Sequence, residues 1–344
     1  MLPYSLSIYA QNTDYKSAAN ELYNNIQQNF YIKDSGYYRE EALGMHSENP
    51  VSFLWPLCAM VQAGNEMDVA FASNHYMDNV LDVIAKYHDD RPPVPGYASY
   101  KLGSKTDDRY YDDNQWIGIA SLDAYKRTKA KKYLELGTEI YHFSMSGYDT
   151  VSGGGIYWVE PKKDGKNTCS NGPGILVALG MYDATGNKQY LDTAAMLYRW
   201  IVQHLRAPNG LYYDNYKVQQ HRVDSTFFSY NAGTMLESSI WLYTVTKQKS
   251  YLDDALLTAR SASDYFLSKG FFKDDYWFNA VMLRGYIRLY HYDKNPAYID
   301  MFKKCLNYTL ANQKHDNRLF GRTKVENLVG QGGLLEMLCR MAVL

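Results

Sequence analysis

Apolar residues recur along the chain at helical spacing, in two alternating sets of segments. Segments of the first set are amphipathic: an aromatic or apolar residue opens each of them, and an apolar stripe follows between polar positions. This pattern occurs six times, at a spacing of roughly 45 to 65 residues. The segments open at Tyr15, Met67, Tyr133, Tyr190, Tyr251 and Tyr298. We expect them to form an outer layer of helices.

The second set lies between these segments and is more apolar and richer in small residues. A helix that is apolar on most of its faces is normally enclosed by other helices, so these segments predict an inner layer. They cover residues 51–63, 114–125, 174–182, 233–245, 280–290 and 328–341.

Six outer helices that alternate with six inner ones predict an all-α fold, an (α/α)6 barrel of six helical hairpins. An open solenoid is the rival, but it needs polar capping repeats at both ends. The last segment, 328–344, remains apolar, and no Pro/Ser-rich linker divides the chain. We therefore expect a closed barrel that forms a single domain over residues 1–344. Extended, glycine-containing pieces such as 153–161 join the two sets, and loops at one mouth of a rigid scaffold commonly carry function.

Composition excludes several classes of protein. Lys and Arg total 36 against 37 Asp and Glu, which leaves no basic excess for nucleic acid and no polybasic patch for anionic membranes. No stretch approaches the roughly 18 apolar residues of a membrane span, and the first residues lack the basic and apolar regions of a signal peptide. The four cysteines contain no CxxC pair and are interpreted as buried free thiols. We therefore expect a cytoplasmic protein.

Motifs for nucleotide binding, for a serine-hydrolase elbow and for a zincin metal site are missing, and the histidines are scattered. We expect no metal and no organic cofactor. Adjacent carboxylates remain as candidates, and two pairs, Asp112-Asp113 and Asp274-Asp275, directly precede predicted inner helices at the barrel mouth. Aspartate is also favoured there as a helix cap. Spacing alone leaves capping and catalysis open for either pair.

Glycoside hydrolysis is the chemistry that such a pair could perform. One carboxylic acid protonates the leaving oxygen, and a second carboxylate attacks the anomeric carbon or activates water; in retaining enzymes the two groups lie about 5–5.5 Å apart. Neighbouring residues in a non-helical entry turn can both reach one ligand, so adjacency fits retention better than inversion. Ionising one carboxylate disfavours ionising the other, which would produce one acid and one base.

Aromatic and amide side chains near the predicted mouth support a sugar site, although 34 tyrosines make aromatic packing common throughout this chain. Flat rings suit the apolar faces of pyranoses, and amides suit their hydroxyl groups. The candidate substrate-binding residues are Trp116, Trp158, Asn167, Asn171, Tyr230 and Asn231.

Several segments resemble glycoside hydrolase family 76, the endo-α-1,6-mannanase family. The resemblance covers roughly residues 10 to 340 and is strongest between 110 and 245. The motifs that carry it are Tyr111-Asp112-Asp113-Asn114-Gln115-Trp116, Gly153-Gly154-Gly155-Ile156-Tyr157-Trp158, Lys166-Asn167 with Ser170-Asn171-Gly172, and Tyr230-Asn231-Ala232-Gly233.

The resemblance implies an (α/α)6 barrel and a retaining hydrolase of α-mannan or α-mannosyl oligosaccharides, with α-1,6 linkages. By motif position it implies that Asp112 is the nucleophile and Asp113 the general acid/base, and so it chooses between the two aspartate pairs. Two departures leave the glycan open: Ala232 stands where the family usually has glutamine, and Phe278-Asn279-Ala280 where it tends to have Phe-Lys-Gly. A shorter imported α-mannoside or another oligosaccharide is an equal expectation.

Two other functions fit the same scaffold. A sugar isomerase or epimerase would use histidines at the mouth, for which only His46 and His221 qualify, and would isomerise a monosaccharide without cleavage. A non-catalytic glycan-binding barrel would bind oligosaccharide without releasing reducing ends. In each case the expected partner is a carbohydrate, with no nucleic acid and no membrane; the sequence leaves the oligomeric state undetermined.

Overall fold

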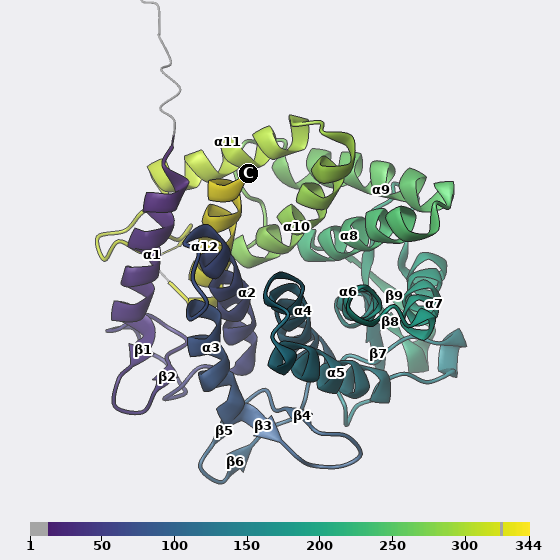
Figure 1. Ribbon diagram of the computed structural model, residues 1–344, viewed down its shortest axis with the longest axis horizontal. Coiled ribbons are helices and arrows are strands. Elements are labelled where there is room, and N and C mark those ends of the chain that lie inside the picture. Colours follow the sequence, from purple (N-terminus) through teal and green to yellow (C-terminus); the bar gives the residue numbers. More distant parts are fainter. Residues whose placement is uncertain (1–12, 324–325) are drawn as a thin grey trace, which may run out of the picture.

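Two concentric layers of helices form a closed ring (Figure 1). The computed structural model describes residues 13–323 and 326–344, and this part of the chain contains twelve α-helices. The inner helices are α2 (Leu54–Ala70), α4 (Tyr111–Thr128), α6 (Thr168–Thr185), α8 (Ser229–Thr246), α10 (Tyr276–Asp293) and α12 (Leu328–Val343). The outer helices are α1 (Tyr15–Phe30), α3 (Tyr76–Ile84), α5 (Lys131–Ser146), α7 (Lys188–Leu205), α9 (Lys249–Ala262) and α11 (Ala297–Asn312).

Each inner helix packs against the next one, and α12 packs against α2 to complete the circle. The outer helices α3, α5, α7, α9 and α11 each pack on the inner helix that precedes them in the chain. The first helix, α1, instead covers α12, so the two ends of the described chain meet in one hairpin (Figure 1). The predicted (α/α)6 barrel is therefore confirmed, and the open solenoid is excluded.

Inner and outer helices are joined by short turns with a repeated geometry. The residue after each of four inner helices adopts the left-handed conformation, and its N–H donates to the carbonyl oxygen of a tyrosine four positions earlier, which satisfies a free C-terminal carbonyl. These residues are Lys129, Gly186, Lys247 and Lys294, bonded to Tyr125, Tyr182, Tyr243 and Tyr290. Part of the high tyrosine content thus belongs to the hairpin turns.

One helix boundary differs from the prediction. Met67 and Ala70 belong to the end of inner helix α2, and the outer helix α3 begins only at Tyr76. Buried Asp68 fixes this turn, because its carboxylate accepts the N–H groups of three consecutive residues that open α3, at 3.0, 3.1 and 3.2 Å. The apolar pattern runs through the turn without a break, so the start of the outer helix predicted from this pattern comes too early in the chain.

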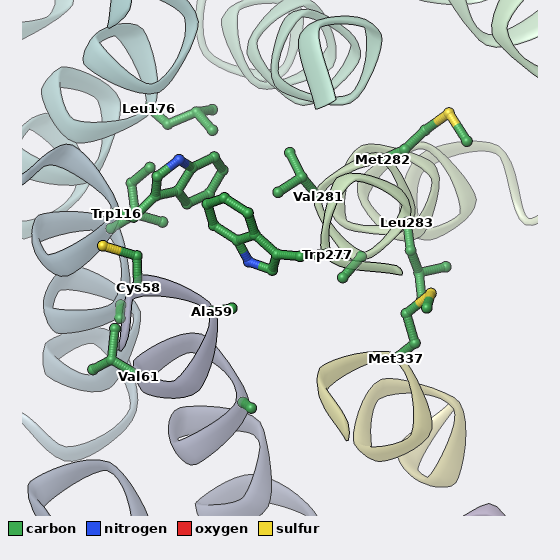
Figure 2. Close-up of a cluster of buried hydrophobic side chains, with 14 of the residues drawn as sticks. Cys58, Ala59, Val61, Trp116, Leu176, Trp277, Val281, Met282, Leu283 and Met337 are labelled. Carbon is green, nitrogen blue, oxygen red and sulfur yellow. The ribbon is translucent and has the colours of Figure 1, made fainter. Parts of the chain in front are cut away.

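Large aromatic side chains and close helix contacts fill the barrel axis. Trp116 of α4 and Trp277 of α10 meet at the centre with ring centroids 5.3 Å apart (Figure 2). Around them the inner helices approach closely: a Cβ at Gly233 would lie 2.5 Å from Met282 Cα, so only glycine allows α8 and α10 this contact. The four cysteines are buried and free, as expected.

The long connections run from each outer helix to the next inner helix, so all of them lie at the mouth where the inner helices begin. They contain short antiparallel strand pairs and one three-stranded sheet of order β7-β8-β9. The strands are β1 (Tyr31–Ile32), β2 (Tyr37–Tyr38), β3 (His88–Asp89), β4 (Gly96–Tyr97), β5 (Lys101–Leu102), β6 (Lys105–Thr106), β7 (Gly165–Asn167), β8 (Tyr213–Lys217) and β9 (Arg222–Phe227).

In the described part of the chain, none of the helices combines the length and apolar character that a bilayer crossing requires. Residues 1–12, on which the signal-peptide prediction rests, lie outside the described residues.

Candidate active site

A cleft of about 770 Å³ opens at the mouth built by the long connections. Its wall combines aromatic rings, carboxylates and amides from four of the long connections and from the starts of α2, α4, α6, α8 and α10. The lining residues are Glu40, Phe53, Trp55, Ser99, Asp107, Tyr110, Asp112, Asp113, Trp158, Asn167, Cys169, Asp214, Asn215, Phe228, Tyr230 and Phe278.

Asp112 and Asp113 both reach this cleft, and each is only 6% exposed. Sequence reasoning placed them in a non-helical entry turn, but α4 begins at Tyr111, so both lie in its first helical turn. Side chains on a helix lean toward its N-terminus, which lets two neighbours in the first turn point toward a cleft beyond the helix end. The positive end of the helix dipole also favours an anion at this position.

Three donors hold the Asp112 carboxylate. Trp158 Nε1–H donates to Oδ2 at 3.0 Å, the Asp113 N–H donates to Oδ1 at 3.1 Å, and the Cys169 thiol donates a further bond. Burial raises the pKa of Asp112 to about 6, and these donors limit that rise. Asp112 is therefore largely ionised at neutral pH.

Asp113 has the opposite charge preference. Burial, and then the negative charge of Asp112, raises the pKa of Asp113 well above its ordinary value. Near neutral pH the pair thus consists of one carboxylate, held by donors, and one neutral carboxylic acid. Two environments that separate the pKa values of neighbouring carboxyls are the mark of an acid/base assignment.

The other polar residues of the aspartate motif are structural. Asn114 accepts the Tyr97 N–H at 2.7 Å and donates to the carbonyl oxygens of Tyr97 and Tyr110 at 2.9 and 2.8 Å. Gln115 donates to the Ser170 carbonyl at 2.7 Å. These bonds fix the start of α4 against strand β4 and against the start of α6, which positions the pair.

Of the predicted substrate-binding residues, Trp158, Asn167 and Tyr230 line the cleft. Trp158 is 40% exposed at the wall of the cleft. Asn231 is fully buried behind the wall, where its amide lies 3.5 Å from Asp214.

Trp116 and Asn171 do not line the cleft. The Trp116 ring is buried against Trp277 in the barrel axis, because its helix face points to the core (Figure 2). The Asn171 side-chain amide bonds only to the backbone among these contacts. It accepts the Ile156 N–H at 2.7 Å and donates to the Ile156 and Asn167 carbonyls at 2.9 and 2.8 Å. Asn171 therefore holds the glycine-rich loop in place. The prediction that it contacts the sugar is corrected, because its amide is fully used by the backbone.

The second aspartate pair lies beside the starts of α8 and α10, and only Asp274 bonds a helix N-terminus through its side chain. Asp274 accepts the N–H of Ser229, the first residue of α8, at 2.7 Å. Asp275 is the N-cap residue of α10 and lies 3.5 Å from Arg322 at the surface. Neither is among the residues that line the cleft. Of the two pairs, only Asp112 and Asp113 are therefore among the residues that line the cleft.

The two candidate histidines lie outside the cleft, as do most of the positions that depart from the family pattern. His46 and His221 are not among the lining residues, and His221 sits at the tip of the β8–β9 hairpin beside Tyr216. At the two departures from the family pattern, only Phe278 reaches the cleft, edge-on to Tyr230 at 4.4 Å between centroids. Asn279 is buried and donates to the Asp274 and Asp275 carbonyls.

Sequence reasoning missed Asp214. It lies on β8 at a register shift between Tyr213 and Asn215, where the strand bulges against β9. Neighbouring strand residues normally point to opposite faces, but a bulge redirects one of them, and here both Asp214 and Asn215 line the cleft. No local sequence signal marks such a bulge.

Comparison with known proteins finds a family and several solved structures that this chain resembles. The sequence profile of glycosyl hydrolase family 76 matches residues 14–276. Mannan endo-1,6-alpha-mannosidase DCW1 of Saccharomyces cerevisiae is 31% identical over 188 residues, which cover 50% of this chain and 40% of the yeast protein. The chain thus matches less than half the length of this curated relative.

Solved structures share the fold. The GH76 alpha-mannanase BT2949 of Bacteroides thetaiotaomicron is 26% identical, with a TM-score of 0.89 and 96% coverage of both chains. An alpha-1,6-mannanase of Salegentibacter was solved in complex with alpha-1,6-mannotetrose, as a variant inactivated at two consecutive aspartates. It is 22% identical to this chain, with a TM-score of 0.81, and the match covers 96% of this chain and 99% of the Salegentibacter chain.

Proposed function

The chain belongs to glycoside hydrolase family 76, and on that premise we propose that it is a retaining hydrolase of α-mannan or α-mannosyl oligosaccharides that cleaves α-1,6 linkages. One observation carries the proposal. Asp112 and Asp113 line one cleft, and burial together with their mutual repulsion favours a single ionised carboxylate near neutral pH.

The mechanism follows from this asymmetry. Asp112, as the anion, attacks the anomeric carbon while Asp113 donates its proton to the glycosidic oxygen, and the bond between that carbon and oxygen breaks. A mannosyl ester of Asp112 results. Asp113, now a carboxylate, takes a proton from water, and the water oxygen displaces Asp112 from the anomeric carbon. Two inversions at this carbon give net retention.

The surrounding wall suits the substrate. Trp158, in the connection between α5 and α6, and Tyr230, in the first turn of α8, both line the cleft. Pyranose rings pack on aromatic surfaces of this kind. The Trp158 indole also holds Asp112, so a sugar stacked on this ring lies beside the nucleophile. None of the described residues that line the cleft is a histidine, so the isomerase hypothesis lacks the acid/base groups that it requires.

The relatives support the linkage. A yeast protein of this family is named as a mannan endo-1,6-alpha-mannosidase, and the Salegentibacter enzyme was captured with an alpha-1,6-mannooligosaccharide after loss of two consecutive aspartates. Asp112 and Asp113 are the consecutive pair that this chain offers in its cleft.

Turnover of α-1,6-mannotetraose by the full chain tests the proposal. Wild type should release reducing ends, and Asp112→Asn and Asp113→Asn should each lower kcat by about a thousandfold or more. Asp275→Asn, a change at the exposed cap of α10, should retain full activity. Saturable binding of the tetraose by wild type without new reducing ends would replace the proposal with a non-catalytic glycan-binding protein.

A further inference from the structure

A buried lysine holds the glycine-rich loop that leads to Trp158. Lys166 is fully buried, and its ammonium group donates to the carbonyl oxygens of Val151 and Gly154 at 2.7 and 2.6 Å. It also pairs with Asp149 Oδ1 at 2.7 Å. An ammonium group has three donors, and these three acceptors match them. The proposed mechanism gives this lysine no part, and it is not among the residues that line the cleft.

The loop depends on such contacts because its own backbone is permissive. Residues 153–155 are three consecutive glycines with φ angles of +77°, +126° and +86°. Glycine loses more conformational freedom on folding than any other residue, so three in a row are costly to order. The Lys166 ammonium also lies 4.6 Å from the centre of the Tyr157 ring, and the Tyr157 hydroxyl bonds to Asp149. Lys166 therefore connects residues before, within and after the glycines.

The end of this loop is joined directly to the start of α4. The Trp158 N–H donates to the Gly165 carbonyl at 3.1 Å, and the Trp158 carbonyl accepts the Tyr111 N–H at 3.0 Å. The Trp158 indole in turn donates to Asp112 Oδ2 at 3.0 Å. A continuous set of contacts thus runs from the buried Lys166 ammonium through the loop to the Asp112 carboxylate.

We propose that Lys166 is a positioning residue for hydrolysis: its ammonium group holds the glycine-rich loop so that the Trp158 indole keeps its bond to Asp112. This inference rests on the proposed function for the role of Asp112 as the nucleophile. Lys166 lies behind the wall of the cleft, so its loss acts on the reaction through Trp158.

The pH profile of α-1,6-mannotetraose cleavage by the full chain separates positioning from a purely structural role. Lys166→Met keeps the length of the side chain but removes its charge and its donors. We expect kcat to fall about tenfold and the acidic limb of kcat/KM to move up by about one pH unit, because a displaced indole no longer favours the Asp112 anion. Lys163→Met, which neutralises an exposed lysine on the same connection, is the matched control and should change neither. Glu237→Gln, which weakens an ion network outside the cleft, should leave the acidic limb in place.

A double variant tests the route of the effect. In Trp158→Phe the indole donor is already lost, so adding Lys166→Met should move the acidic limb no further. An equal shift in both backgrounds would show that Lys166 acts independently of Trp158 and would overturn the inference. Asp149→Asn removes the carboxylate that pairs with Lys166 and should move the limb in the same direction by less. If Lys166→Met folds poorly, Asp149→Asn decides the question, and an unmoved limb there overturns the inference.

Titration of Asp112 itself keeps the two proposals distinguishable. Carboxyl-carbon NMR of aspartate-labelled protein, with Asp112→Asn to assign the signal, gives the pKa of Asp112 without turnover. We expect this pKa to be higher in Lys166→Met than in wild type. If it is higher but wild type does not cleave the tetraose, the link from Lys166 to Asp112 stands and the hydrolase is wrong. If wild type cleaves the tetraose but neither the pKa nor the acidic limb moves in Lys166→Met, the positioning role is wrong and the hydrolase stands.

Discussion

Trp158 Nε1 lies 3.0 Å from Asp112 Oδ2, and the same indole is 40% exposed at the wall of the cleft. One side chain therefore connects the surface that a sugar would cover with the carboxylate that would attack it. The connection between α5 and α6 carries Trp158, and the first turn of α4 carries Asp112. Their contact holds the Asp112 carboxylate from outside its own helix.

Trp158→Phe should lower kcat by about 10- to 100-fold, because it removes one donor to a charged carboxylate while a ring remains for stacking. The lost bond should also raise the pKa of Asp112, so the acidic limb of the pH profile moves to higher pH. Steady-state kinetics across pH checks both effects. Trp55→Phe, a change at another ring that lines the cleft, is the control and should leave the acidic limb of the pH profile in place. If the acidic limb of Trp158→Phe also stays in place, the proposed role of the Trp158 indole is wrong.

The pH dependence of activity should be bell-shaped. Asp112 must be ionised, and its pKa is raised by burial to about 6, so kcat/KM should rise with pH through about 6. Asp113 must be protonated, and its pKa is raised further by burial and by Asp112, so activity should fall again at higher pH. Because the two groups interact, the two limbs belong to the pair. A profile that falls steadily from pH 5 upward would show that Asp112 is not needed as an anion.

Asp112→Asn should stabilise the fold while it abolishes turnover. Burial raises the pKa of Asp112 in the folded chain, so the stability that this group contributes is present below its unfolded pKa and is lost as pH rises through about 6. Removing the charge at pH 7 should raise the free energy of unfolding by about 1–3 kcal/mol. Chemical denaturation at pH 7 measures this, with Asp275→Asn as a control that leaves stability unchanged. Destabilisation by Asp112→Asn would show that the hydrogen bonds to Asp112 outweigh the cost of burying its charge.

Glu237→Gln should strongly destabilise the barrel, because it breaks a buried ion network that lies outside the cleft. Buried Arg284 lies 3.1 Å from Glu237 and 2.9 Å from Asp123, and Arg288 also lies 3.1 Å from Glu237. Burial raises the pKa of Glu237, but the two arginines outweigh this and lower it to about 2. Loss of the carboxylate leaves a buried guanidinium under-paired, which typically costs about 3–5 kcal/mol.

Denaturation at pH 7 measures this loss. Glu135→Gln, which breaks an exposed pair with Lys131, provides the control and should leave the denaturation midpoint nearly unchanged, because water and salt screen exposed pairs. Because the pKa of Glu237 is lowered on folding, its contribution is present above its unfolded pKa and disappears as pH falls toward about 2. Equal destabilisation by the two variants would contradict the role of the buried network.

The sequence predicted the barrel because inner and outer helices differ in pattern: inner helices such as α6 are buried on every face, and outer helices such as α7 on one. It misplaced the start of α3 because the turn there is defined by a tertiary feature, the Asp68 carboxylate, and the apolar pattern continues across it. The cytoplasmic location stays a prediction.

The site was predictable to the extent that it is local. Asp112 and Asp113 are neighbours in one short motif at the start of α4, so the pair could be recognised from consecutive residues of the sequence. Trp116 was misjudged because the motif does not show which helix face meets the core. Asp214 was missed because it reaches the cleft through a bulge that depends on the pairing of β8 with β9.

The anomer that forms first from α-1,6-mannotetraose tests the central claim most directly. Proton NMR during the first minutes of hydrolysis by wild type follows the new reducing end before mutarotation. The two-step mechanism through an Asp112 ester predicts that the α-anomer appears first and that Asp112→Asn releases none. A β-anomer formed first would contradict the assignment of Asp112 as a nucleophile and would show a single displacement by water.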